Sequence, residues 1–195
     1  MGVLDVQGDV AEHVNALQKS KESLGLDATV LSVRDKDVIC RLHALLIPGG
    51  ESTTISMLME KYDLDEAVRG LAAEGAPIMG TCAGLVLMSS GGGSQVEMTG
   101  QKLLSLMDVR VERNAYGRQV DSFEADLQIP VIGGGSFSGV FIRAPVMAEV
   151  GAGVKPLCRL SERIVMASQD NLLGLTFHPE LTGDTRIHEF FLGMV

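Results

Sequence analysis

The first half of the chain alternates short apolar runs with amphipathic stretches. The apolar runs have the length of buried strands, and they fall at residues 2–6 (GVLDV), 27–33 (DATVLSV), 43–50 (HALLIPGG) and 76–81 (APIMGT). The intervening segments carry apolar residues at helical spacing, and they cover residues 10–24, 53–62, 64–75 and 83–91. This order of strands and helices predicts a parallel sheet with helices on both faces.

Two of the expected helices begin with residues that favour helix capping. Asp9 precedes the first helix, and Glu12 follows three residues later, as in a capping box. After the glycine turn at residues 48–50, we expect Ser52 or Thr53 to cap the next helix.

The second half of the chain has a different pattern. Its apolar runs are rich in β-branched residues and are separated by turns, which predicts strands. These runs are residues 110–131, 138–145, 154–162, 163–171 and 172–180. The last stretch, residues 184–195 (DTRIHEFFLGMV), predicts a short amphipathic helix.

Composition and charge narrow the class of protein. With 46% hydrophobic and 21% charged residues, the chain is globular, and its 195 residues suit a single domain over residues 1–195. A net charge of −9 repels phosphate backbones, so we expect no nucleic-acid partner. No apolar run has the roughly 18 residues that a membrane span needs, and the N-terminal stretch lacks the basic region of a secretory signal. We therefore expect a cytoplasmic protein that does not enter membranes.

The cysteine pattern gives no sign of a metal site. Cys40, Cys82 and Cys158 are odd in number and widely spaced, so they form neither a metal-binding motif nor a disulfide framework. For Cys40 and Cys158 we expect a role in core packing.

Cys82 stands in an unusual local sequence. Gly80-Thr81-Cys82-Ala83-Gly84 follows a predicted strand and opens a predicted helix, which is the pattern of a nucleophile at a sharp strand-to-helix turn. The helix that begins at Ala83 directs its N-terminal N–H groups toward the sulfur, which favours the reactive thiolate. The five residues alone leave open a cysteine that merely packs. Their place at the carboxyl end of a strand favours the nucleophile.

A nucleophile of this kind needs a base. His178 follows a predicted strand and has Glu180 two residues further on, which is the arrangement of a base and the carboxylate that orients it. The alternative is a structural histidine. The other three are His13 in the first helix, His43 at the start of a strand, and His188, which we expect at the surface or the core edge.

The stretch Ile47-Pro48-Gly49-Gly50-Glu51 ends another predicted strand in a turn of small residues. Unobstructed backbone N–H groups at such a turn can stabilise a developing oxyanion. A plain turn that precedes a helix is the other interpretation, and both can hold at once.

Several motifs together resemble those of a known family. PGGES (48–52), GTCAG (80–84) and FHPE (177–180) together resemble motifs of the class I, or triad, glutamine amidotransferases. A closer resemblance, to one family within that class, rests on the longer motifs VQGDVAEH (6–13), IPGGESTT (47–54), GTCAGLVL (80–87), RNAYGRQVDSFEADL (113–127), GVFIRAP (139–145) and TFHPELTGD (176–184). The match is most specific to the glutaminase subunits of pyridoxal 5′-phosphate synthase, and it extends over the whole chain.

The resemblance implies a fold and a set of site residues. The fold would be a three-layer α/β/α sandwich with a mostly parallel central sheet, and the reaction would be hydrolysis of L-glutamine to L-glutamate and ammonia. Cys82 would be the nucleophile, His178 the base and Glu180 its partner. The residues implied to hold glutamine are Gly50, Glu51, Ser52, Arg113, Ile142 and Arg143. The implied oxyanion donors lie at Gly49, Gly50 and Ala83.

The resemblance also implies a partner and no cofactor. Ammonia would pass to a synthase subunit that makes pyridoxal 5′-phosphate, within a hetero-oligomeric complex, and synthase binding would complete the glutaminase site. The segment Gln7-Gly8-Asp9 would lie at or near that interface. No metal or organic cofactor is expected.

Three alternatives remain in view. The triad is common to class I glutaminases that serve histidine, purine or anthranilate synthesis, although the RNAYGRQVDSFE block argues against these. A non-catalytic interaction subunit is a second alternative, and the intact Cys-His-Glu set argues against it. The third is a cysteine hydrolase of the peptidase or α/β type that works without a partner.

Overall fold

The computed structural model describes residues 1–113 and 122–195, so residues 114–121 of the RNAYGRQVDSFEADL block lie outside the described part. The central sheet begins with five parallel strands, in the order β2 (Leu31–Val33), β1 (Gly2–Leu4), β3 (Leu45–Ile47), β4 (Ile78–Thr81) and β12 (Leu172–Leu175). It continues with antiparallel pairings through β11 (Arg163–Gln169), β9 (Val146–Val150) and β6 (Met107–Glu112). Parallel β5 (Ser89–Gly92) follows on β6, and β10 (Lys155–Leu160) pairs with β11. Two further strands, β7 (Ser122–Leu127) and β8 (Phe137–Ile142), form a separate antiparallel pair.

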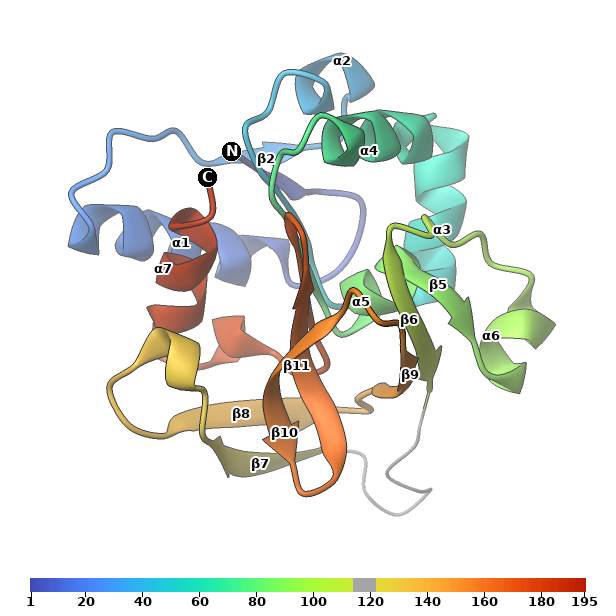
Figure 1. The fold of residues 1–195 in the computed structure, drawn as a ribbon. Coiled ribbons are helices and arrows are strands. Elements are labelled where there is room, and N and C mark those ends of the chain that lie inside the picture. The colour runs from blue at the N-terminus through green and yellow to red at the C-terminus, as the bar shows by residue number, and fades with distance from the viewer. Residues whose placement is uncertain (114–121) are drawn as a thin grey trace.

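The helices surround this sheet (Figure 1). They are α1 (Val10–Ser23), α2 (Lys36–Ile39), α3 (Ser52–Lys61), α4 (Leu64–Ala73), α5 (Ala83–Met88), α6 (Ser94–Thr99) and α7 (Arg186–Leu192), with short 3-10 turns η1 (Pro130–Ile132) and η2 (Pro179–Leu181). None of the helices in the described ranges is long and apolar enough to cross a membrane.

Two hydrophobic cores lie on the two faces of the sheet. Successive residues of a strand point to opposite faces. Leu45 and Ile47 of β3 therefore pack into a core shared with α3, α4 and α5, whereas Leu46 packs into a second core shared with α1 and α7. In Figure 1, α1 and α7 lie side by side on one side of the sheet and α3 and α4 lie on the other. The predicted α/β class and its three layers are confirmed.

The predicted N-cap position of the first helix is confirmed, but its capping hydrogen bond is absent, and the cap expected for the helix after the glycine turn is wrong. Asp9 does occupy the N-cap position of α1, but its side chain makes no capping hydrogen bond. For α3, the N-cap is Glu51, not Ser52 or Thr53. Its carboxylate accepts hydrogen bonds from the N–H groups of Thr53 (3.2 Å) and Thr54 (2.7 Å). Glu51 therefore caps the N–H groups that a serine at the N-cap position would bond, with a longer side chain.

Two further side-chain placements differ from expectation. Cys40 is exposed, so it does not pack in the core, whereas Cys158 is buried as expected. His188 is completely buried and lies inside the second core layer, not at the surface or core edge. α7 turns this residue inward toward α1.

The strand order explains where a site can form. β3, β4 and β12 are parallel neighbours, so their carboxyl ends lie at one edge of the sheet. The segments that follow these ends are residues 48–50, Cys82 and residues 176–180. Ligands in open α/β sheets bind outside such carboxyl ends.

Candidate functional site

Cys82 sits in the turn between β4 and α5 with a left-handed backbone (φ 47°, ψ −100°). A residue other than glycine rarely adopts this conformation, and such strain is typical of functional sites. The two flanking glycines are required by packing. A Cβ atom on Gly84 would lie 2.1 Å from the carbonyl oxygen of Ile47, and one on Gly80 would lie 2.5 Å from Met88 Sδ. The glycines therefore let α5 pack tightly on β3 and β4, which holds the turn sharp and leaves the thiol at its tip.

His178 comes from the strand next to β4. Leu175 of β12 is paired with Thr81 of β4, and the N–H of Cys82 donates to the carbonyl of Leu175 over 2.9 Å. The N–H of His178 donates to the carbonyl of Val140 in β8 (2.8 Å). These backbone bonds fix the thiol and the imidazole on neighbouring strand ends.

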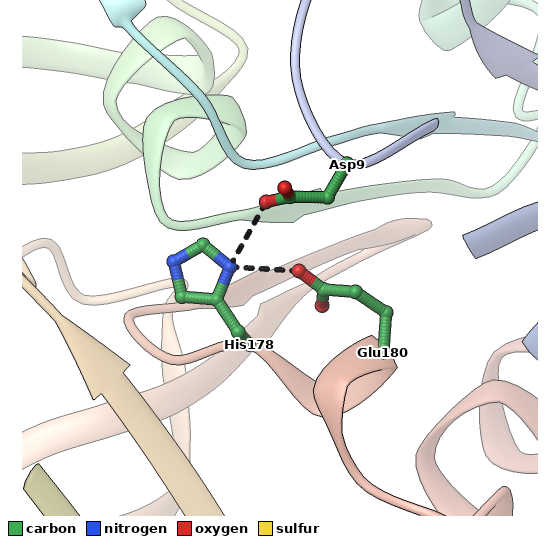
Figure 2. Close-up of side chains that lie close together, drawn as sticks. All are labelled: Asp9, His178 and Glu180. Carbon is green, nitrogen blue, oxygen red and sulfur yellow. Dashed lines mark hydrogen bonds and ion pairs between the residues drawn. The ribbon is translucent and has the colours of Figure 1, made fainter. Parts of the chain in front are cut away.

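Two carboxylates face the same nitrogen of His178. Nδ1 lies 2.7 Å from Oε1 of Glu180 and 3.4 Å from Oδ2 of Asp9. Figure 2 shows Glu180 reaching Nδ1 from the 3-10 turn and Asp9 reaching the same nitrogen from a separate segment above it. With Nδ1–H donated to carboxylate, Nε2 is the ring nitrogen that is left to accept a proton.

The electrostatics favour a protonated imidazole. Burial opposes the charge, but hydrogen bonds with Asp9, Cys82 and Glu180 outweigh it and raise the pKa of His178 to about 12. The hydrogen bond from His178 also holds the pKa of Asp9 below its usual range, against the effect of partial burial. Burial raises the pKa of Glu180, and the contact with His178 opposes that rise. Glu180 therefore depends on His178 for its negative charge.

A pair of buried histidines lies behind Glu180. His13 Nε2 is 3.2 Å from Glu180 Oε2 and 3.1 Å from Thr81 Oγ1, and His13 Nδ1 is 3.0 Å from His188 Nε2. Both rings are completely buried. Burial lowers the pKa of His13 well below its usual range and that of His188 to about 4, so both are neutral at pH 7.

The partners of these rings define their tautomers. His188 Nδ1 has no hydrogen-bond partner within the described ranges. A buried N–H without an acceptor is costly, so the proton of His188 belongs on Nε2, from where it is donated to His13 Nδ1. His13 then carries its own proton on Nε2, which lies within hydrogen-bond distance of Thr81 Oγ1 and near Glu180 Oε2, a carboxylate oxygen without a hydrogen-bond partner in the described residues. Sequence reasoning found no signal for this pair, because His13 and His188 lie 175 positions apart along the chain and meet only in the fold.

A pocket of about 370 Å³ opens beside the thiol and the imidazole. Its lining residues come from six segments of the chain, and they are Gln7, Asp9, Gly50, Glu51, Ser52, Cys82, Ala83, Val86, Arg113, Ile142, Arg143, Pro145 and His178. All the predicted glutamine-holding residues are among them. Glu180 lies behind His178 and does not line the pocket. Sequence reasoning placed Gln7 and Asp9 only at a partner interface and missed Val86 and Pro145.

Besides Asp9 and His178, the charged side chains of Arg113, Arg143 and Glu51 line the pocket. Arg113 Nη2 lies 3.5 Å from Glu51 Oε1. Arg143 follows β8 with a left-handed backbone (φ 41°), and Ile142 just before it offers its carbonyl 3.9 Å from Cys82 Sγ. Ser52 is buried and its hydroxyl donates to Gln101 Oε1 (3.0 Å). Two arginines at the mouth of one pocket can bind a carboxylate by paired N–H groups.

The glycine turn packs directly on the candidate base. A Cβ atom on Gly49 would lie 2.5 Å from His178 Cε1 and 3.1 Å from Asp9 Oδ2. Gly50 has φ 149°, and a Cβ there would lie 2.5 Å from Gln7 Oε1. Only glycine permits this approach of backbone to side chain, which brings the turn's peptide groups next to the imidazole.

Three side chains also lie close enough together to be considered as ligands of one metal ion. Potential ligand atoms of Asp9, His178 and Glu180 lie within 4.8 Å of one another. Two atoms bound to one zinc ion at about 2.0 Å in tetrahedral geometry lie about 3.3 Å apart. Nδ1 and Oε1 are only 2.7 Å apart, so a shared proton fits between them and a metal ion does not.

Comparison with solved structures defines the class of protein. A structure described as "Crystal structure of glutamine amidotransferase" matches with a TM-score of 0.86 and 43% identity, over 99% of this chain and 97% of that chain. The glutaminase domain of Trypanosoma brucei CTPS with bound acivicin matches with a TM-score of 0.67 at 12% identity, over 99% of this chain and 91% of that chain. The second match supports the fold alone. The fold is class I glutamine amidotransferase-like.

Sequence comparison gives the family. The model of the SNO glutamine amidotransferase family matches residues 3–195, and this chain belongs to that family. It is 49% identical over 195 residues to a Methanosarcina mazei protein named "Pyridoxal 5'-phosphate synthase subunit PdxT", covering 100% of this chain and 98% of that protein. It is 51% identical over 192 residues to a protein of the same name from Archaeoglobus fulgidus, covering 98% and 96%. The family resemblance inferred from the motifs is confirmed.

Proposed function

We propose that this protein, as a single glutaminase domain over residues 1–195, hydrolyses L-glutamine to L-glutamate and ammonia. Family membership supports the reaction. The observation that carries the site assignment is a strained, left-handed cysteine next to a carboxylate-bound histidine, at one wall of a pocket. These are the nucleophile, base and orienting group of a covalent hydrolase.

In the first half of the reaction, Cys82 acts as a thiolate and attacks the side-chain carbonyl carbon of glutamine. Backbone N–H groups near Gly49 and Gly50, together with that of Ala83, stabilise the tetrahedral oxyanion. The imidazolium of His178 gives its Nε2 proton to the departing nitrogen. Ammonia leaves, and a γ-glutamyl thioester remains on the sulfur.

In the second half, neutral His178 removes a proton from water, and the resulting hydroxide attacks the thioester. The carbon–sulfur bond breaks, glutamate leaves, and the thiolate–imidazolium pair is restored. Glu180 accepts Nδ1–H throughout, so Nε2 faces the reacting atoms at each step. No metal or organic cofactor takes part.

Substrate binding is assigned to the charged wall of the pocket. Arg113 and Arg143 bind the α-carboxylate of glutamine, and Glu51 is the acid available for its ammonium group. Gly50, Ser52 and Ile142 complete the wall. A pocket of about 370 Å³ suits a molecule of this size.

The names of the relatives support a partner. Proteins with about half their residues identical to this chain are called subunits of pyridoxal 5′-phosphate synthase. We therefore assign the ammonia to a separate synthase subunit that makes pyridoxal 5′-phosphate in a hetero-oligomeric complex. A cytoplasmic location, without nucleic-acid or membrane partners, fits this role and stays a prediction.

The first experiment measures glutamate release from glutamine, with and without the synthase subunit. We expect low activity alone and a strong rise with the partner. High activity alone, unchanged by the partner, would remove the synthase assignment but leave the triad.

The matched variant is Cys82→Ala, for which we expect no glutamine hydrolysis under either condition. Near wild-type turnover by this variant would overturn the assignment of the nucleophile. Asparagine and peptides serve as control substrates, since a general cysteine hydrolase would release product from them too.

A further inference from the structure

The carboxylate of Asp9 contacts His178 and does not cap α1. Its position before α1 and the glutamate at position 12 suit a capping box, yet the Asp9 side chain makes no capping bond. Instead Oδ2 lies 3.4 Å from His178 Nδ1 (Figure 2). The side chain of Asp9 therefore turns away from the N-terminus of α1 and toward the candidate base, His178.

Asp9 and Glu180 compete for one proton. An imidazole carries a single proton on Nδ1, and the two carboxylates approach it at 3.4 and 2.7 Å. The Glu180 side chain is completely buried, while that of Asp9 is 37% exposed. One acceptor is therefore fixed inside the protein, and the other lies in the wall of the pocket.

The backbone around Asp9 joins this contact to the glycine turn. The N–H of Asp9 donates to the carbonyl of Gly49 (3.3 Å), and the N–H of Glu51 donates to Gln7 Oε1 (2.8 Å). A Cβ atom on Gly8 would lie 1.7 Å from that same Gly49 carbonyl oxygen. The segment 7–9 and the turn 49–51 are thus packed backbone to backbone, with the imidazole of His178 against both.

We propose that Asp9 is a second positioning carboxylate for His178, which shares the Nδ1 proton with Glu180 and couples the imidazole to the glycine turn. This inference rests on the proposed function. Asp9 acts through His178 and is not placed on the reacting atoms. Its role is to hold the imidazolium in place beside the turn, together with Glu180.

In the part of the chain that the structure describes, few charged or titratable groups surround His178. Cys82 faces it from the start of α5, Glu180 from the 3-10 turn, and Asp9 from the segment before α1. His13 lies beyond Glu180. Of these, Asp9 is the charged group that can be neutralised by an isosteric change without emptying the buried network.

A double-mutant cycle tests the sharing. Asp9→Asn, Glu180→Gln and the double variant are compared by glutamate release in the presence of the synthase subunit, with Glu12→Gln as the matched control. Glu12 is an exposed acid on the same helix end. We expect Asp9→Asn to lower kcat about tenfold with KM little changed, because His178 loses one of its two orienting carboxylate contacts, which we equate with about one power of ten in rate.

The kcat of the double variant shows whether Asp9 and Glu180 share the Nδ1 proton or act independently. If the two carboxylates replace each other on one proton, the double variant loses at least tenfold more than the product of the two single losses. A loss equal to that product, or wild-type kcat in Asp9→Asn, overturns the proposal. Melting temperatures close to wild type for Asp9→Asn show that the loss is not one of folding.

A second readout does not depend on activity. In protein labelled with ¹⁵N-histidine, the imidazolium signals of His178 report its protonation. We expect these signals to be lost at a pH about 1 to 3 lower in Asp9→Asn than in wild type, and unchanged in Glu12→Gln. An unchanged titration in Asp9→Asn overturns the proposal. If the wild-type protein with its partner releases no glutamate, the proposed function fails, and the titration still decides the role of Asp9.

Discussion

The imidazole of His178 divides the site into two sides that are built differently. On the inner side, Glu180 and then His13 and His188 follow one another in complete or nearly complete burial. On the outer side, Asp9 and the pair Glu51–Arg113 lie in a pocket wall that is open to solvent. Groups on the inner side are fixed by packing on two helices, while those on the outer side come from segments between elements. The inner side can therefore set the orientation of the base, and the outer side can respond to what enters the pocket.

The largest effect should come from the inner carboxylate. Glu180→Gln keeps the size of the side chain but removes the charge that orients His178 and stabilises its imidazolium. We expect kcat to fall about 10²-fold, which is less than the complete loss in Cys82→Ala, because Glu180 orients and does not react. Steady-state kinetics of glutamate release measure this. An unchanged kcat would mean that the outer side alone orients the base.

The buried histidines should make the inner side sensitive to acid. In the unfolded chain a histidine takes up a proton near pH 6.5, whereas folded His188, with a pKa of about 4, stays neutral. The unfolded state then binds more protons between these values, so the free energy of unfolding falls as the pH falls. His188 accounts for a loss of about 3 kcal/mol between pH 6.5 and 4.

Denaturant unfolding at several pH values tests this loss. His188→Gln retains an N–H donor for His13 and cannot titrate, so its stability should depend less on pH in this range. His43→Gln changes an exposed histidine and is the matched control. Equal pH dependence in all three proteins would contradict a neutral, buried His188.

The sequence carries local signals for the residues at the strand ends but none for the two buried histidines of the inner side. Cys82, His178 and Glu180 carry local signals, since each lies in a short motif at the end of an apolar run. His13 and His188 sit in ordinary helical patterns, and only the packing of α1 on α7 brings their rings to 3.0 Å. A pattern along the chain cannot show a contact of that kind.

The missing capping bond of Asp9 and the wrong cap expected for α3 have a related cause. Asp9 and Ser52 were assigned by local preference, which holds where no tertiary partner competes. In the structure Asp9 faces His178, and Ser52 donates to Gln101. Local rules failed at positions that line the pocket, which is where a site imposes requirements of its own.

A smaller effect on kcat is expected for His13, which lies behind Glu180. His13→Leu removes the N–H that faces Glu180 Oε2, so the carboxylate is held less firmly in a buried place. We expect kcat to fall about tenfold with KM unchanged, since His13 does not line the pocket. His13→Gln, which can present an amide N–H near the position of Nε2, should recover most of the rate.

Recovery of kcat in His13→Gln would show that His13 positions Glu180 and does not only fill space in the core. A purely structural role would lower the melting temperature in both variants and leave kcat at its wild-type value. In that case the histidine pair would belong to the core alone, and the inner side would end at Glu180.

The smallest effect should come from Glu51 on the outer side, which has two roles at once. Its carboxylate caps α3 through Thr53 and Thr54 and also lies 3.5 Å from Arg113. Glu51→Ala loses the cap, so we expect the free energy of unfolding to fall by about 1 kcal/mol. Glu51→Gln keeps an acceptor for the cap and removes the charge, so it should be nearly as stable as wild type but show a raised KM for glutamine. If KM is unchanged in Glu51→Gln, this residue serves the helix alone, and the outer side binds substrate through its arginines.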